Sequence, residues 1–313
     1  MRTLLKNAWL LDNNYNMEPA NVLIGGERIV SVSREPLEAE RVIDLRDCTV
    51  MPGLVDTDLS CEDPAELDNR LRGYMDTAVT TARCDRMPTE ILDGFPQILY
   101  SCPAVNSRMD LDHLNSKKLE MGGIKLGRKL VGAQKESEIR DICRRCAQGG
   151  LWVMAYAASL AELQILTSCG ITELLNTPDF QIPDAEITRM VTKGICITLS
   201  TWDSAHITQV QQNNLRRFDS MGGMITLGSG RTKLPVSCDQ IITLLEAGIS
   251  LQNAVRSASF SGAVVVGTAQ DEGTIMAGKY ANLVVVLGNL REEPSALGHT
   301  HFIVRKGRVR QIS

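Results

Sequence analysis

Eight short apolar runs that alternate with helical patterns are the feature of this 313-residue chain that most restricts its fold. Such alternation indicates parallel βα units, because a helix crosses over between one parallel strand and the next. The predicted strands are residues 53–58, 79–84, 97–102, 123–126, 152–157, 171–176, 195–200 and 224–227. Eight units predict an α/β fold built as a (β/α)8 TIM barrel, and a doubly wound open sheet is the alternative.

The predicted helix over residues 138–148 has the clearest amphipathic pattern. Its apolar positions recur at i, i+3, i+4 and i+7, namely Ile139, Ile142, Cys143 and Cys146. Ser137 is the expected N-cap, and Gly149 is expected to end the helix. A second helix is predicted over residues 239–247, with Gly248 directly after it. Cys143 and Cys146 form a Cys-X-X-Cys pair, which is either a redox or metal pair or two thiols on a buried face.

Both ends of the chain differ from the middle because they are predicted to form short strands. These are residues 4–11, 21–24, 28–32, 41–45 and 49–51, and then 281–287, 301–305 and 308–312. We predict that residues 1–51 and 267–313 together form a small composite β-sandwich domain. The barrel would then occupy residues 52–266.

Charge and hydropathy exclude several classes of partner. The net charge is −4, and no basic block is present to neutralise phosphates, so we expect no nucleic-acid partner. No apolar run reaches the ~18 residues that a membrane span needs, so we expect no membrane partner. The N-terminal residues lack a signal-peptide pattern, which predicts a cytoplasmic protein. Its nine cysteines are then expected to be free thiols.

Residues 48–60, Cys-Thr-Val-Met-Pro-Gly-Leu-Val-Asp-Thr-Asp-Leu-Ser, resemble the first barrel strand of the amidohydrolase superfamily, in its imidazolonepropionase- and dihydroorotase-like branch. In that family a Pro-Gly-hydrophobic-hydrophobic-Asp run leads into a His-X-His pair that binds a catalytic metal. Here the run is kept, but Asp58 and Ser60 occupy the histidine positions. Residues 77–83, 251–259 and 272–286 are similar to later family segments, so the resemblance covers nearly the whole chain.

The resemblance also assigns the other metal positions, one strand at a time. The fourth-strand position, often a carboxylated lysine, falls on Lys125, and the fifth-strand histidine falls on Tyr156. The sixth-strand histidine falls on Asn176, and the eighth-strand aspartate on Gly230 or on Ser229. A catalytic metal needs about three ligands drawn from His, Cys and carboxylate. We therefore expect no family-type metal cofactor, with zinc the first metal to test.

Without a metal, Lys125 needs another role, because a buried ammonium is costly unless it is paired or neutralised. One interpretation is an ion pair with Asp58 that fills the former metal cavity. A second is that Lys125 holds an anionic ligand group. A third is a Schiff-base nucleophile, although no second acid or base is clearly placed to serve it.

Further candidate residues follow the predicted strands, where the active sites of such barrels lie. Cys61, Cys84 and Cys102 are either reactive or metal-binding thiols or inert packing groups. The eighth strand ends in Leu-Gly-Ser-Gly-Arg-Thr-Lys, residues 227–233, whose glycine amides, with Arg231 and Lys233, would suit a phosphate or carboxylate. A tight loop is the alternative. Ser200, Thr201 and Trp202 would add a hydroxyl and a stacking face to the same pocket.

Three functions remain open at this point. The first is an amidohydrolase-fold protein with a degenerate metal site that binds a small anionic ligand, lined by Ser60, Cys84, Cys102, Asn176, Ser229 and Arg231. The second is an active hydrolase of non-peptide C–N bonds, of the cyclic amide or amidine type, whose catalytic residues are Lys125, Asp58 and Tyr156. The third is a structural or regulatory subunit of an oligomer. The resemblance is compatible with a homodimer.

Overall fold

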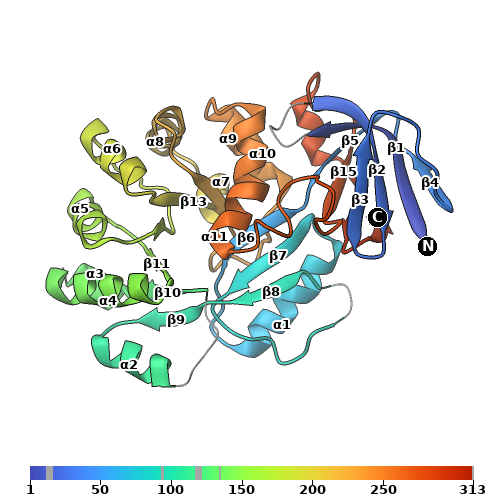
Figure 1. The fold of residues 1–313 in the computed structure, drawn as a ribbon. Helices are drawn as coiled ribbons and strands as arrows, with labels where there is room; N and C mark the ends of the chain where they lie inside the picture. The colour runs from blue at the N-terminus through green and yellow to red at the C-terminus, as the bar shows by residue number, and fades with distance from the viewer. Residues whose placement is uncertain (12–16, 93–94, 117–121, 134, 312–313) are drawn as a thin grey trace.

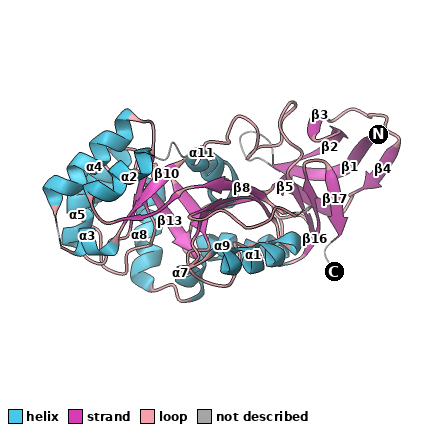
Figure 2. Ribbon diagram, turned by 90° about the horizontal axis from the view of Figure 1, so that it is seen from below, coloured by secondary structure: helices cyan, strands magenta, loops and turns pink. Residues whose placement is uncertain are grey.

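The fold of the chain was taken from a computed structural model, which describes residues 1–11, 17–92, 95–116, 122–133 and 135–311. The middle of the chain forms parallel strands arranged around a common axis, with helices on their outer side (Figure 1). The terminal segments form a separate sheet at one end of the molecule, while α2 to α5 lie at the other end (Figure 2). No helix in these ranges is both long and apolar enough to cross a membrane.

The barrel consists of a three-stranded and a six-stranded sheet whose neighbouring strands are parallel. The strands are β6 (Leu54–Leu59), β7 (Val79–Cys84), β8 (Gln97–Tyr100), β9 (Cys102–Val105), β10 (Gly123–Leu126), β11 (Trp152–Ala155), β12 (Glu173–Leu174), β13 (Cys196–Ser200) and β14 (Ile225–Gly228). The third predicted strand is divided at Ser101, so that β8 pairs with β7 and β9 pairs with β10.

The barrel closes where β14 returns to β6. The Gly230 N–H donates to the Asp58 carbonyl at 2.6 Å, and the Ser60 N–H donates to the Gly230 carbonyl at 3.0 Å. The Thr57 hydroxyl adds a bond to the Leu227 carbonyl at 3.0 Å. This closure confirms the predicted barrel and rules out the open sheet.

Helices follow most of the strands, and longer ones such as α4 and α5 bury apolar residues against the barrel. Their bounds are α1 (Pro64–Gly73), α2 (Arg108–Ser116), α3 (Arg128–Gly132), α4 (Glu136–Gln148), α5 (Leu160–Cys169), α6 (Asp184–Thr192), α7 (Thr201–Ala205), α8 (Gln209–Ser220), α9 (Cys238–Glu246), α10 (Leu251–Arg256) and α11 (Gly262–Val266). A π-helical turn over Ser257–Ser261 joins α10 to α11, and 3-10 turns cover Tyr74–Asp76 and Pro294–Gly298.

Helix α4 buries the four residues predicted for its apolar face, but its predicted N-cap is wrong. The helix begins at Glu136, so that Ser137 lies inside its first turn, and the cap residue Lys135 makes no side-chain cap bond. Glu136 and Glu138 in the first turn instead complement the positive end of the helix dipole. Both thiols of the Cys-X-X-Cys pair are free and buried.

The terminal sheet joins both ends of the chain. Its strands are β1 (Arg2–Leu11), β2 (Met17–Gly25), β3 (Arg28–Ser33), β4 (Arg41–Asp44), β5 (Cys48–Pro52), β15 (Leu283–Leu287), β16 (Thr300–Arg305) and β17 (Arg308–Gln311). They run in the order β17-β16-β15-β5-β1-β2-β3, with β4 beside β1. The antiparallel pairing of β15 with β5 is the link between the two ends. The exact domain bounds remain a prediction.

The Pro-Gly step passes the chain from the terminal sheet into the barrel. Pro52 ends β5, and Leu54 begins β6 one residue later. A Cβ atom at Gly53 would lie 2.3 Å from the Thr80 side chain, so only glycine fits this close approach of two strands. The step fixes the register of β6 and therefore places Asp58 and Ser60 at the end of that strand.

Candidate functional site

Lys125 and Asp58 form an ion pair at the carboxyl ends of β10 and β6. Their Nζ and Oδ1 atoms lie 2.7 Å apart, and the two side chains are only 9% and 6% exposed. The Ser60 hydroxyl donates to the same Asp58 oxygen at 2.8 Å and accepts from the Lys125 ammonium. The Tyr156 hydroxyl donates to the other oxygen at 2.9 Å. The ion pair predicted from the sequence is confirmed, and Tyr156 and Ser60 belong to the same network.

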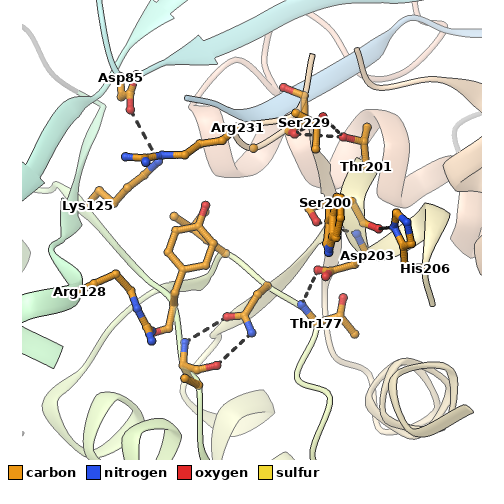
Figure 3. Close-up of a pocket in the computed structure, with 18 of the residues that line it drawn as sticks. Asp85, Lys125, Arg128, Thr177, Ser200, Thr201, Asp203, His206, Ser229 and Arg231 are labelled. Carbon is orange, nitrogen blue, oxygen red and sulfur yellow. Dashed lines mark hydrogen bonds and ion pairs between the residues drawn. The ribbon is translucent and has the colours of Figure 1, made fainter. Parts of the chain in front are cut away.

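The electrostatics of this network keep Asp58 ionised. Burial alone would raise the pKa of Asp58, but the Lys125 charge and the hydrogen bonds from Lys125, Ser60 and Tyr156 outweigh burial and hold the pKa below its usual value. Burial raises the pKa of the Tyr156 phenol well above its usual value, so this group stays a neutral donor. Asp85 adds a more distant carboxylate, 3.9 Å from the ammonium (Figure 3).

These residues do not fit a catalytic metal of the kind that the resemblance implies. In the part of the chain that the structure describes, no group of three or more His, Cys, Asp or Glu side chains is placed to hold a metal ion. Asp58 is the one carboxylate at an inherited ligand position, and both of its oxygens already accept hydrogen bonds. A cation at Asp58 would compete with the Lys125 ammonium for the same oxygens.

Asn176 and Ser229, at positions that the resemblance assigns to metal ligands, hold the backbone together. The Asn176 amide accepts from the Ala157 N–H at 3.1 Å and donates to the Ala157 carbonyl at 3.0 Å, which ties the ends of β11 and β12. Ser229 donates its N–H to Asp56 at 3.0 Å. Both residues also line the cavity described below.

Arg70 of α1 is a site residue that the sequence reasoning missed. It donates to the Ser60 carbonyl at 2.7 Å, to the Gly230 carbonyl at 3.1 Å and to the Ser229 hydroxyl at 2.9 Å. The guanidinium is buried and clamps the loop after β14 against the end of β6. The sequence signal was an arginine at a helical spacing between Leu67 and Tyr74, on the buried face of α1.

The glycine turn after β14 does not offer the free amides expected from its sequence. The Gly230 N–H donates to the Asp58 carbonyl, the Ser229 N–H to the Asp56 carboxylate, and the Thr232 N–H to the Ser229 carbonyl. These three amides are therefore not free to bind an anion, which leaves the side chains of Arg231 and Lys233 as the charged donors of this loop. Arg231 and Lys233 make no hydrogen bond or ion pair with the residues that the structure describes, and both line the cavity.

Two of the cysteines near the strand ends, Cys61 and Cys84, have environments that favour the protonated thiol. Cys84 is fully buried, burial raises its pKa well above the usual value, and its side chain does not line the cavity. Burial likewise raises the pKa of Cys61 to about 11, although Cys61 does line the cavity. Neither environment favours a thiolate nucleophile. The side chain of Cys102 lies outside the described part of the structure.

A cavity of about 1280 Å³ opens at the carboxyl ends of the barrel strands. Lys125 and Arg231 lie on one side of it, and Asp203 and His206 lie on the other (Figure 3). Ser200 caps α7 by accepting from the Asp203 N–H at 3.0 Å, so its hydroxyl is already engaged. Trp202 lines the cavity as predicted for a stacking face.

Comparisons with known proteins agree with this architecture. The sequence profile of the amidohydrolase family matches residues 121–311. A dihydroorotase from Pediococcus pentosaceus is 31% identical over 98 residues, which are 28% of this chain and only 23% of that protein.

Two solved structures are similar over almost the whole chain. A prolidase in complex with N-methylphosphonate-L-proline superimposes with a TM-score of 0.81 at 18% identity, covering 99% of this chain and 100% of that one. A putative prolidase from Bifidobacterium longum gives a TM-score of 0.77 at 20% identity, covering 99% and 94%. At these identities the likeness shows a shared fold.

Proposed function

The chain belongs to the amidohydrolase family, and we propose that it binds a small anionic ligand at its barrel mouth without family-type metal-dependent hydrolysis. The observation that carries this proposal is the ion pair between Lys125 and Asp58. Their direct contact gives the carboxylate a countercharge from within the protein. The pair therefore supports a degenerate metal site. In this site the Asp58 oxygens accept hydrogen bonds from Lys125, Tyr156 and Ser60 and do not bind a metal.

The anionic character of the ligand is inferred from the cations that border the cavity. Lys125 is neutralised by Asp58, and Arg128 is paired with Glu162 at 3.4 Å. Arg231 and Lys233 have no such partner in the described part of the chain. A guanidinium that is not paired within the protein is suited to bind a carboxylate or phosphate in two-pronged geometry.

Metal analysis tests the degenerate site. We expect the protein, purified with zinc, manganese or iron in the medium, to carry well under one equivalent of any of them. A chelator should leave its thermal unfolding temperature unchanged. A stoichiometric metal that is lost in both the Asp58→Asn and the Lys125→Met variants would contradict the proposal, because it would place a metal at the ion pair.

A thermal-shift screen of phosphorylated and carboxylated metabolites tests the anion site. We expect hits among anions, and we expect Arg231→Ala to abolish the shift. Arg46→Ala is the matched control, since Arg46 is an exposed arginine of the terminal sheet that pairs with Asp44. An undiminished response of Arg231→Ala would show that the anion binds elsewhere.

A hydrolase of cyclic amides or amidines is the second candidate, favoured by the position of Lys125 and Tyr156 on the cavity wall. Turnover of such substrates by metal-free protein, with loss of turnover in Lys125→Met and in Tyr156→Phe, would favour this candidate over the first. The homodimer stays a prediction, which size-exclusion chromatography with light scattering would check.

A further inference from the structure

The cavity is much larger than a simple anion requires. Its volume of about 1280 Å³ exceeds the range of roughly 300–1,000 Å³ that is typical of small-molecule sites. A phosphate or acetate at Arg231 would leave most of this space to water. The remaining wall should therefore contain a second recognition element.

Trp202 provides that element. Its side chain lines the cavity and is 61% exposed, so a large aromatic surface is open to a ligand. The indole stacks on the His206 ring with centroids 4.1 Å apart and an interplanar angle of 27°. The His206 Nδ1 atom lies 3.0 Å from the Trp202 carbonyl, which ties the two residues together. The indole is thus supported on one side and open over much of its remaining surface.

Trp202 and Arg231 follow neighbouring strands of the barrel. Trp202 lies on α7, directly after β13, and Arg231 follows β14, the neighbouring strand. The hydroxyl of Thr201 donates to the Ser229 carbonyl at 3.0 Å, which ties α7 to the loop that carries Arg231. Leu234, also exposed and also on the cavity wall, adds apolar surface from the same loop.

A carboxylate lies on each side of the cavity, but Asp85 lies with the cations, 3.9 Å from the Lys125 ammonium (Figure 3). Asp203 lies on the side of His206, away from Lys125 and Arg231 (Figure 3). The Asp203 carboxylate accepts from the Thr177 N–H at 3.1 Å and would repel a second negative group on that side of the cavity. The side that carries the indole therefore suits an uncharged flat group, because aromatic rings stack favourably on tryptophan.

We propose that the ligand of this cavity is a small aryl compound with a single anionic group, a carboxylate or phosphate, which Arg231 holds while the ring stacks on Trp202. This inference rests on the proposed function and extends it from a charge to a chemical class. It predicts that the ring adds affinity to the anion, and that a second anionic group at the far end of the ring removes this gain.

Titrations with four probes test the inference: inorganic phosphate, phenyl phosphate, benzoate and terephthalate. Calorimetry should show phenyl phosphate binding about tenfold more tightly than phosphate, since an aromatic pair contributes on that order. Benzoate should bind more tightly than terephthalate. Phenyl phosphate should also change the tryptophan fluorescence.

Variants of Trp202 and Arg231 test the aryl inference and the anion site separately. Trp202→Ala should lower phenyl phosphate affinity to that of phosphate and leave phosphate affinity unchanged, while Trp202→Phe should keep most of the gain. Arg231→Ala should weaken every probe. Equal affinities for phosphate and phenyl phosphate, or an unaltered phenyl phosphate affinity in Trp202→Ala, would overturn the aryl inference alone. If no probe binds the wild type, the inference and the anion proposal both fail.

Discussion

Two buried ion pairs lie inside the barrel, and they differ in what surrounds them. The enclosed pair is Arg83 of β7 with Glu173 of β12. The Arg83 Nη2 and Glu173 Oε2 atoms lie 2.5 Å apart, and the side chains are 2% and 0% exposed. The mouth pair, Lys125 with Asp58, joins β10 to β6, and its lysine borders the cavity. The enclosed pair thus has no access to solvent or ligand, whereas the mouth pair lies next to both.

The partners of the enclosed pair are protein groups. Arg83 donates from Nε to the Thr57 carbonyl at 2.7 Å, and Glu173 accepts from the Thr198 hydroxyl at 2.8 Å. The Thr198 hydroxyl in turn contacts that of Thr226 at 2.9 Å. A buried charge in such a setting depends on its protein partner for all of its neutralisation. At the mouth, by contrast, water from the cavity can replace part of a lost partner.

The largest effect is expected when the enclosed pair is broken. Glu173→Gln keeps the shape of the side chain but leaves the Arg83 charge buried without a countercharge. We expect the free energy of unfolding to fall by about 3–5 kcal/mol, measured by urea denaturation. The exposed pair of Arg140 and Glu136 gives the control, because Glu136→Gln loses only an exposed ion pair and a helix-dipole contact and should cost about 1 kcal/mol or less.

Removing both charges of the enclosed pair sharpens this test. The double variant Arg83→Met, Glu173→Leu should be more stable than Glu173→Gln, since no unpaired charge is left. If Glu173→Gln lowers the free energy of unfolding no more than Glu136→Gln does, then the Arg83 charge does not depend on Glu173 for its neutralisation. The proposed contrast with the mouth pair would then be wrong.

A smaller loss is expected when the mouth pair is broken. Lys125→Met removes the ammonium, but Asp58 keeps hydrogen bonds from Ser60 and Tyr156. Asp58 and Ser60 do not line the cavity themselves, whereas Lys125 and Tyr156 do, so cavity water can approach from the side of the removed ammonium. We expect the free energy of unfolding to fall by about 1–3 kcal/mol in the same assay. Lys233→Met, which removes an exposed cation at the same mouth, should change stability by less than about 0.5 kcal/mol. A cost for Lys125→Met equal to that of Glu173→Gln would show that cavity water does not relieve the lost charge.

The sequence predicted the mouth pair but not the enclosed pair, for a physical reason. The carboxyl ends of parallel strands meet at one end of a barrel. Once the strands that carry Asp58 and Lys125 are recognised, their positions at those ends therefore predict that the two side chains lie close together. Glu173 lies in a short apolar run, and nothing in its neighbours indicates which strand it faces across the interior. Arg70 was missed likewise, because its three acceptors belong to strand ends distant in sequence.

The same limit applies to the loop after β14. Its glycines and cations were read correctly as a turn with exposed charge at Arg231. The use of its amides depends on the return of β14 to β6, which is a tertiary contact. Local patterns therefore located the cavity wall, whereas barrel closure decided that the amides of Ser229 and Gly230 are not free to meet a ligand.

The smallest effect is expected from one hydrogen bond within the mouth pair network. Tyr156→Phe removes a donor to Asp58 and should lower the free energy of unfolding by about 1 kcal/mol at pH 7. The phenol helps to depress the folded pKa of Asp58, so the variant has a higher folded pKa. A depressed aspartate pKa contributes stability above the unfolded pKa, near 3.9, that is lost as the pH falls through the folded value. The difference in the free energy of unfolding between wild type and Tyr156→Phe should thus become smaller below about pH 4.

Tyr74→Phe is the matched control for this pH dependence. Tyr74 donates to Asp56 on the same strand at 2.6 Å, but burial raises the pKa of Asp56 above its usual value despite that bond. Asp56 therefore takes up its proton at a higher pH than Asp58, and the gap between wild type and Tyr74→Phe should narrow at a higher pH than the gap for Tyr156→Phe. Urea denaturation between pH 3 and 7 measures both gaps. Identical pH profiles would mean that the Lys125 charge does not set the ionisation of Asp58, and the mouth pair would lose the feature that distinguishes it from an ordinary buried carboxylate.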